Sequence, residues 1–338
     1  MRRIYRTIFN PFARRTPKLP AILMYHRVAR LQYDPWGLAV DPERFDAQMD
    51  WLASERLVLP LHDFVDQLRV GDLPDDSIAI TFDDGYVDNL TSALPAIRRH
   101  GLCATLFVVG GAIGHSEGFW WDELARLILE NKTKLNASVT IGHCTVSLNW
   151  PDEVDSPGPD PLWRAWEKPS QAREVAYLAA WQALRNVSSD ARLEAMRELR
   201  LLLRAVDMER DRAMKVHELR ALIAAGSFTL GGHTMTHPAL PTLANDASRA
   251  ELAESLAICR SLIPSGRFGF AYPYGDLDER VRGEVEASGF AWACSTRSEP
   301  VDRRRFDPFA LPRLAVGDRR PERLAAFLQT NGNDAVSN

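Results

Sequence analysis

The chain has 338 residues, 46% of them hydrophobic, and a formal net charge of −4 at pH 7. This composition is ordinary for a soluble globular protein, and the slight acidity gives no reason to expect a nucleic-acid partner. No apolar run approaches the length of a membrane span. The four cysteines are scattered without C-x-x-C spacing, which suits a reducing compartment.

The beginning of the chain, Met1 to Lys18, is basic. It contains Arg and Lys side chains, no Asp or Glu, and interleaved aromatic and aliphatic residues. It lacks the continuous apolar segment of a secretory signal, so we expect a cytoplasmic protein. We interpret residues 1–18 as a loose basic tail. The alternative is a short amphipathic segment whose residues 2–15 touch an anionic membrane surface, peripheral to the inner membrane.

Apolar strand-like segments alternate with amphipathic helical segments along most of the chain. Pro42 to Glu55 has helical spacing with Asp41 as its N-cap, and residues 89–100 form a second predicted helix that Gly101 ends. Such alternation predicts parallel strands wrapped by helices. The expected strands are 21–25, 78–82, 104–109, 230–232, 268–272, 290–294 and 310–316. The later expected helices are 215–225, 246–262, 277–287 and 321–329.

Residues 114–215 interrupt this alternation. We expect helices at 119–131, 171–185 and 190–206, and a small hairpin around Gly142. Six of the nine tryptophans fall in this insertion, and most of them should pack it onto the barrel. One or two could instead present a flat face to a sugar ring. The expected organisation is therefore an α/β fold, a single distorted and incomplete (β/α) barrel over residues 19–330. The mainly helical insertion interrupts it, and residues 331–338 form a disordered tail.

Three of the strand-like segments end in polar residues. These ends are Asp83-Asp84-Gly85, His233-Thr234-Met235-Thr236-His237 and Pro273-Tyr274-Gly275. Sites in (β/α) barrels lie at the C-terminal ends of strands, so one shared site is expected. Two histidines four apart in a helical turn can face one cation, and one carboxylate completes a ligand set with open positions. A second carboxylate beside it can take a proton from water.

Together these segments resemble the NodB-homology family, the polysaccharide deacetylases of carbohydrate esterase family four. The first family motif, Thr-Phe-Asp-Asp-Gly, is complete at residues 81–85, and the second, His-Ser/Thr-x-x-His, is complete at residues 233–237. The resemblance covers residues 19 to about 316. It implies that Asp83 is the catalytic base. It also implies one divalent metal ion, zinc first with cobalt, manganese, nickel or iron as alternatives, held by Asp84, His233 and His237.

The third family motif, Arg-x-Pro-Tyr-Gly, is matched only in part. Pro273 and Tyr274 are present, but Ala271 stands where the family usually has an arginine that orients the catalytic aspartate. The resemblance implies that the backbone N–H of Tyr274 helps to hold the oxyanion. It also makes Pro273 and Tyr86 candidates for contact with the substrate. Arg313 could reach the place of the missing arginine from the last strand, or it could form an ordinary ion pair.

The general acid of the family is usually a histidine in a late Leu-x-His motif, and no histidine follows His237. One branch of the family, which includes poly-N-acetylglucosamine deacetylases, has an early Tyr-His motif that resembles Tyr25-His26. His26 is therefore the candidate proton donor or substrate-binding group. We expect its ring at the rim of the metal site, on the side opposite Asp83. The alternative is a histidine hydrogen-bonded within the barrel mouth.

The predicted function is that of a metal-dependent hydrolase. It would remove an N-acetyl group from an amino sugar in a polysaccharide, an oligosaccharide or a lipid-linked glycan. One alternative is an amidase or deformylase that acts on a small or lipid-linked substrate. Another is a carbohydrate-binding protein with weakened catalysis, which the alanine at position 271 and the missing late histidine suggest. The intact base and ligand set argue against this second alternative.

Overall fold

The computed structural model describes residues 18–115, 118–151, 158–203 and 211–330. The expected basic tail, the end of the helix predicted at 190–206 and the tail at 331–338 therefore lie wholly or mostly outside the described residues. Among the helices of the described ranges, none has both the length and the apolar character needed to cross a bilayer.

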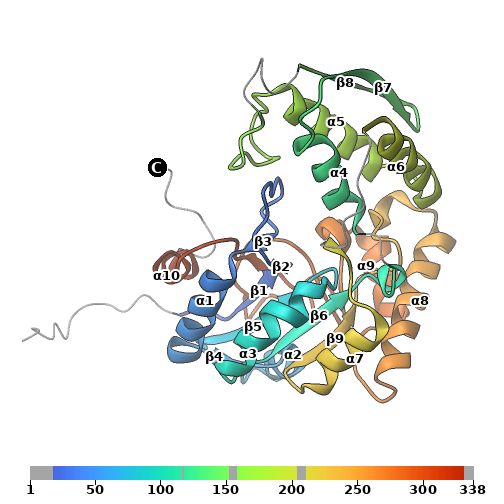
Figure 1. Ribbon diagram of the computed structural model, residues 1–338. Helices are drawn as coiled ribbons and strands as arrows, with labels where there is room; N and C mark the ends of the chain where they lie inside the picture. Colours follow the sequence, from blue (N-terminus) through green and yellow to red (C-terminus); the bar gives the residue numbers. More distant parts are fainter. Residues whose placement is uncertain (1–17, 116–117, 152–157, 204–210, 331–338) are drawn as a thin grey trace, which may run out of the picture.

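The centre of the fold is a parallel sheet that curves into an incomplete barrel (Figure 1). The strand order is β11-β10-β9-β6-β5-β1-β12, and the short β4 pairs with β5. These strands are β1 (Ala21–Tyr25), β4 (Leu57–Val58), β5 (Ser77–Phe82), β6 (Ala104–Val108), β9 (Phe228–Gly232), β10 (Gly269–Ala271), β11 (Trp292–Cys294) and β12 (Leu314–Ala315). Every residue of β1, β5 and β6 is buried, as expected for strands covered on both faces. The predicted fold class is confirmed.

The barrel does not close by strand pairing alone. Between β11 and β12, the chain runs alongside β11 as an irregular segment, in which Leu311 donates its N–H to Ala293 and Ser295 donates its N–H to Leu311. The segment then enters β12, which pairs with β1. Arg313 is the last residue of this irregular segment and therefore lies between the two ends of the sheet. It is part of the site described below.

Helices surround the sheet, and most of them match the sequence-based expectation (Figure 1). The side chain of Asp41 accepts hydrogen bonds from the first turn of α1, which confirms the predicted N-cap. The helices are α1 (Pro42–Glu55), α2 (Leu61–Val70), α3 (Leu94–Arg99), α7 (Val216–Ala224), α8 (Asn245–Leu262), α9 (Glu279–Ala287) and α10 (Pro321–Gln329). The sequence analysis missed α2, the short β4, and the two-residue strands β2 (Arg27–Val28) and β3 (Ala39–Val40).

The helix expected at 89–100 is present, but its first half is not an α-helix. Residues Asn89–Ala93 form a wide π turn, in which the N–H of Leu94 bonds the carbonyl of Asn89, and only then does α3 begin. Pro95 explains the difference, because it has no N–H to donate one turn back and its ring crowds the carbonyl there.

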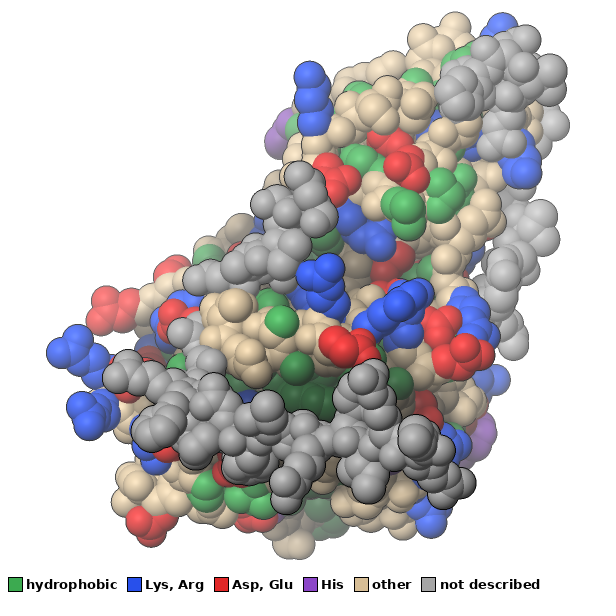
Figure 2. All heavy atoms as spheres, turned by 90° about the vertical axis from the view of Figure 1, so that its left-hand side faces the viewer, with side chains coloured by type: hydrophobic (Ala, Val, Ile, Leu, Met, Phe, Trp, Pro, Cys, Tyr) green, Lys and Arg blue, Asp and Glu red, His purple; other side chains and the backbone are tan. Residues whose placement is uncertain are grey.

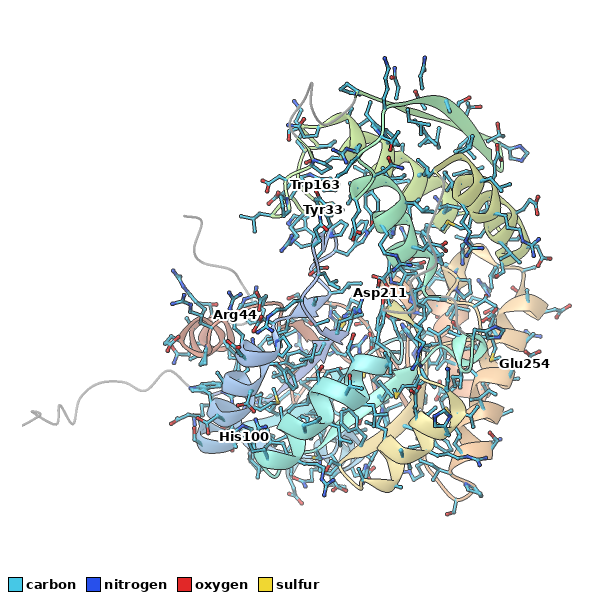
Figure 3. The ribbon with its side chains drawn as sticks, viewed as in Figure 1. Tyr33, Arg44, His100, Trp163, Asp211 and Glu254 are labelled. Carbon is cyan, nitrogen blue, oxygen red and sulfur yellow. The ribbon has the colours of Figure 1, made fainter. Side chains whose placement is uncertain are left out.

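The insertion is a separate layer that stands over one end of the barrel (Figure 1). Its elements are α4 (Trp120–Leu129), the antiparallel hairpin of β7 (Leu135–Ile141) and β8 (Cys144–Trp150), α5 (Ala172–Arg185) and α6 (Ser189–Leu203). These elements share a hydrophobic core of their own. The barrel loop 29–38 reaches up to them, and the N–H of Ala165 bonds the carbonyl of Pro35 at 2.7 Å. Figure 3 shows Tyr33 of this loop beside Trp163 of the insertion.

A buried arginine fastens the insertion to the barrel. Arg27 lies with its Nε 3.0 Å from Asp88, and its Nη1 lies 2.8 Å from Asp211 and 3.6 Å from Asp122. Figure 3 shows Asp211 where the insertion meets the barrel. Burial raises the pKa of Asp122 to about 7, against the opposing effects of Arg27 and of the hydrogen bond from Tyr86. Arg27 therefore lies beside three buried carboxylates that come from both layers, and it shares Asp211 with Arg126.

Arg27→Met should lower the free energy of unfolding by about 3–5 kcal/mol, because it leaves the buried carboxylate of Asp88 without its ion-pair partner and removes one cation from beside Asp122 and Asp211. The measurement is urea denaturation followed by circular dichroism. Arg44→Met is the control, because Arg44 forms an exposed pair with Asp318 and its loss should cost only about 0–1 kcal/mol. Equal losses in the two variants would contradict the role given to Arg27.

Candidate active site

The backbone at the end of β5 turns two adjacent carboxylates toward one place. Asp83 continues the strand by donating its N–H to the carbonyl of Tyr25 at 3.0 Å. Asp84 then takes the left-handed conformation, with φ of 72°, and Gly85 follows with φ of 92°. Among the described residues, the non-glycine residues with positive φ are Asp84, Thr234, His237 and Tyr274. All four follow strands β5, β9 or β10, and such strained backbone is typical of functional sites.

The three predicted metal ligands converge. The Nε2 atoms of His233 and His237 lie 3.5 Å and 3.6 Å from Oδ1 of Asp84, and all three side chains are buried. His233 holds its ring with Nδ1, which is 2.7 Å from the carbonyl oxygen of Ala271, so Nε2 carries the free lone pair. Oδ1 of Asp84 has no hydrogen-bond partner among the described residues. Among the described residues, these three side chains form a cluster that could hold a metal ion, because one ligand atom of each lies within 4.8 Å of the other two.

The expectation that the two histidines share a helical turn was wrong. The segment after β9 is an irregular loop, with φ of 63° at Thr234 and 54° at His237. The hydroxyl of Thr234 accepts the N–H of His237 at 3.0 Å. Glu251 of α8 accepts the N–H of Met235 at 2.6 Å. Spacing by four residues is compatible with a helix, but here side-chain hydrogen bonds fix a tighter loop that brings both rings to Asp84.

Arg313 binds the other carboxylate of the pair. Its Nη1 and Nη2 atoms each lie 2.7 Å from an oxygen of Asp83, and its Nε donates to the carbonyl of Ser295 at 3.0 Å. Both side chains are fully or almost fully buried. Ala271 lies in a buried apolar cluster on β10. The guanidinium thus arrives from the segment before β12 rather than from β10.

The electrostatics of the two aspartates differ. Burial raises the pKa of Asp83, but the charges of Arg313 and His233 and the hydrogen bonds from Arg313 outweigh it, so the net shift is downward. Burial also raises the pKa of Asp84, and there the neighbouring charges of Asp83 and Asp122 raise it further. Burial lowers the pKa of both His233 and His237. Asp83 is therefore ionised, whereas Asp84 favours its protonated form as long as no cation takes the place of the proton.

His26 lies at the rim of the site, as expected, but on a different side. It follows β1, which pairs with β5, and its Nε2 is 3.9 Å from Oδ2 of Asp83. The ring is therefore beside Asp83 and not opposite it. Burial lowers the pKa of His26 to about 4, against the opposing charge of Asp83, so the ring is neutral at pH 7.

The three residues expected at the substrate or oxyanion fall into two groups. Tyr274 lines the cavity over the aspartates, and its ring packs against that of His237 with centroids 4.6 Å apart. Pro273 is buried in the same short turn. Tyr86 is fully buried, and its hydroxyl donates to Asp122 at 2.6 Å and accepts from Trp121 at 2.7 Å. Because that hydroxyl is used within the protein, Tyr86 supports the site from behind and does not face a substrate.

A cavity of about 420 Å³ lies over these groups. The barrel contributes the polar side chains, and the insertion contributes Trp121, Trp181 and Arg185 to the wall. Trp36, on the barrel loop, also lines the cavity, and the centroid of its ring lies 4.2 Å from that of Trp181. The tryptophans thus form one aromatic wall of the cavity. Figure 2 shows hydrophobic and basic side chains together on the face where the two layers meet. Sequence reasoning raised the tryptophans of the insertion but missed Trp36 and Arg185, which no motif marks.

Comparison with known proteins agrees with this fold and this arrangement of side chains. The family model for polysaccharide deacetylase matches residues 70–148 and 204–293, which is half of the chain. The chain belongs to the polysaccharide deacetylase family. It is also 35% identical over 112 residues to YxkH of Bacillus subtilis strain 168, which carries the provisional name of a polysaccharide deacetylase. That match covers 32% of this chain and only 38% of YxkH.

Solved structures show the same fold over nearly the whole chain. The deacetylase PplD of Streptococcus pyogenes, in complex with acetate, has a TM-score of 0.58 at 16% identity, and the match covers 93% of this chain and 99% of PplD. IcaB of Ammonifex degensii has a TM-score of 0.56 at 17% identity, and the match covers 93% of this chain and 98% of IcaB. The NodB-type barrel expected from the motifs is thereby confirmed.

Metal affinity should rise with pH, because a metal ion at this site displaces the proton that Asp84 favours. Below the pKa of Asp84, the Kd for Co²⁺ should fall by up to about tenfold per pH unit, and it should level off above that pKa. Absorption spectroscopy of Co²⁺ titrations from pH 5 to 8 measures this. Asp84→Asn should bind more weakly and with a flatter pH dependence, and an unchanged slope in that variant would exclude Asp84 as the titrating ligand.

Proposed function

We propose that the protein is a metal-dependent hydrolase that removes an N-acetyl group from an amino sugar in a polysaccharide, an oligosaccharide or a lipid-linked glycan. The observation that carries the proposal is that the adjacent residues Asp83 and Asp84 have different partners. Asp83 is ion-paired to Arg313, and its neighbour Asp84 faces His233 and His237. Both halves open on one cavity in a chain of the polysaccharide deacetylase family.

The chemistry of the donor set fits a divalent metal ion. The separations of 3.5 Å and 3.6 Å from Asp84 to the two imidazoles are close to the roughly 3.4 Å between ligands of a tetrahedral zinc ion. Three protein ligands leave a position open, as catalytic zinc sites do. Zinc is proposed first, with cobalt, manganese, nickel or iron as alternatives. When bound, such an ion acidifies water and polarises a carbonyl group.

Asp83 is the proposed general base. Its carboxylate is ionised at neutral pH because Arg313 lowers its pKa, and the same guanidinium fixes its orientation by two parallel hydrogen bonds. Arg313 is thus a positioning residue that substitutes for the arginine absent at Ala271. The backbone N–H of Tyr274 is the proposed donor to the oxyanion that forms as the amide is attacked.

His26 is proposed to contact the substrate next to Asp83. At neutral pH its ring is neutral, so it can donate or accept one hydrogen bond at each nitrogen but carries no acidic proton of low pKa. The role of proton donor to the leaving amine would require the pKa of His26 to rise in the complex with substrate.

The aromatic wall favours a sugar over a small acyclic amide. Trp36 and Trp181 line the cavity beside the polar groups, and flat apolar faces next to a few placed polar groups are typical of ligand sites that hold rings. An amidase or deformylase would use the same polar residues without that wall. The cytoplasmic location and the membrane contact of residues 2–15 stay predictions, and those residues lie outside the described ranges.

Asp83→Asn should keep the metal ion but lower the rate of acetate release by roughly 10²–10⁴, as expected when a general base is removed. His233→Ala should instead lose the metal ion itself. Elemental analysis and acetate release from a panel of N-acetylated glycans and lipid-linked sugars are the measurements. Equal metal content in the two variants would contradict the division of roles, and no acetate from any substrate with metal-loaded protein would contradict the function.

His26→Gln should retain the metal ion, lower the rate and alter the pH–rate profile. Glutamine can still hydrogen-bond a substrate but cannot titrate, so a rate loss without a change of profile would assign His26 to binding alone. A profile and rate both equal to those of the wild type would show that His26 has no part in the reaction.

A further inference from the structure

The insertion delivers one charged side chain to the cavity. Arg185 is the last residue of α5 and forms an ion pair with Asp276, which follows the turn that contains Tyr274. Its guanidinium carbon lies 4.5 Å from the centroid of the Tyr274 ring and 5.6 Å from that of Trp181. Arg185 is therefore fixed between the insertion and the oxyanion turn of the barrel.

Not all of its donors are used. Nη2 of Arg185 donates to Asp276, whereas Nη1 makes no hydrogen bond to another described residue and, unlike the enclosed Nε, is open to solvent. A guanidinium presents five N–H donors in a rigid fork, so the two N–H bonds of Nη1 remain available. The side chain is 27% exposed overall and lies in the cavity wall. A ligand in the cavity can therefore accept a hydrogen bond from Nη1.

The charge of the pair limits the kind of acceptor. Asp276 balances the charge of Arg185 from outside the cavity lining, so the pair presents N–H donors to the cavity with little net charge. Such donors suit neutral acceptor groups, and sugar hydroxyls are of that kind. The rings of Trp36 and Trp181 in the same wall suit the apolar face of the sugar.

We propose that Arg185 is a specificity-determining residue, which donates to a hydroxyl of the amino sugar while Asp276 holds its guanidinium in place. This inference rests on the proposed function and extends it, because it makes the insertion the part of the chain that recognises the sugar ring. The barrel residues then act on the acetamide, and the α5 residues hold the ring to which it is attached.

The test compares Arg185→Met and Arg185→Lys with the wild type on N-acetylglucosamine trimers of β-1,4 and β-1,6 linkage. Loss of the fork should lower kcat/KM by about 10- to 100-fold, mainly through KM, with metal content and melting temperature retained. Lysine restores the charge beside Asp276 but not the second terminal nitrogen of the fork, so Arg185→Lys should remain impaired. Recovery by lysine would show that the ion pair is only structural and would overturn the proposal.

Arg267→Met is the matched control. Arg267 also pairs with an aspartate, Asp66, and also lies over a tryptophan, Trp292, with its guanidinium carbon 5.7 Å from the ring centroid. It does not line the cavity. Its replacement should leave KM unchanged. A rise in KM equal to that of Arg185→Met would attribute the effect to lost packing in general and would contradict the proposal.

A binding arm separates this inference from the proposed function. In the Asp83→Asn background, calorimetry should detect the trimers binding, and a further Arg185→Met change should weaken that binding by about tenfold or more. Weakened binding supports the inference even if the wild type releases no acetate, which would contradict only the function. Acetate release with equal KM and equal binding in both forms would overturn the inference alone. The absence of both binding and acetate release would contradict the inference and the proposed function together.

Discussion

The bidentate ion pair between Arg313 and Asp83 is the interaction on which the candidate site depends. Two carboxylates side by side in a buried place repel each other, and burial raises the pKa of both. The guanidinium resolves this conflict for Asp83 alone, because both of its outer nitrogens face that carboxylate. Asp84 is left as the acid whose charge needs a different cation. One arginine therefore assigns different chemistry to two adjacent and identical residues.

The sequence was sufficient to predict the barrel and the meeting of Asp84, His233 and His237, because both leave local patterns. Fully apolar segments mark the parallel strands, and the polar residues that follow them mark the rim. The position of Arg313 has no such local pattern. It follows from the pairing of β1 with both β5 and β12, which brings a segment distant in sequence next to Asp83. Ala271 showed that an arginine was missing, and Arg313 was one candidate for its place, but only the fold shows that the guanidinium of Arg313 reaches Asp83.

The errors of the sequence-based reading also have local causes. The spacing of His233 and His237 fits one helical turn, yet the hydroxyl of Thr234 and the carboxylate of Glu251 hold the backbone in a tighter loop. Trp36 escaped notice because it lies in a loop without periodicity, and its place is defined by contact with the insertion. Residue spacing thus predicts which side chains can meet, whereas hydrogen bonds from other elements decide the backbone that brings them together.

The separation of Asp83 and Arg313 along the chain has a consequence for how the protein is made. The two residues are 230 positions apart. A ribosome adds roughly 5–20 residues per second, so Asp83 leaves the ribosome well before its cation exists. During that interval strands β1, β5 and β6 can pair, but the carboxylate at their ends has no counter-charge. Burial of Asp83 as a charged carboxylate therefore has to follow the synthesis of Arg313 and the docking of β12 on β1.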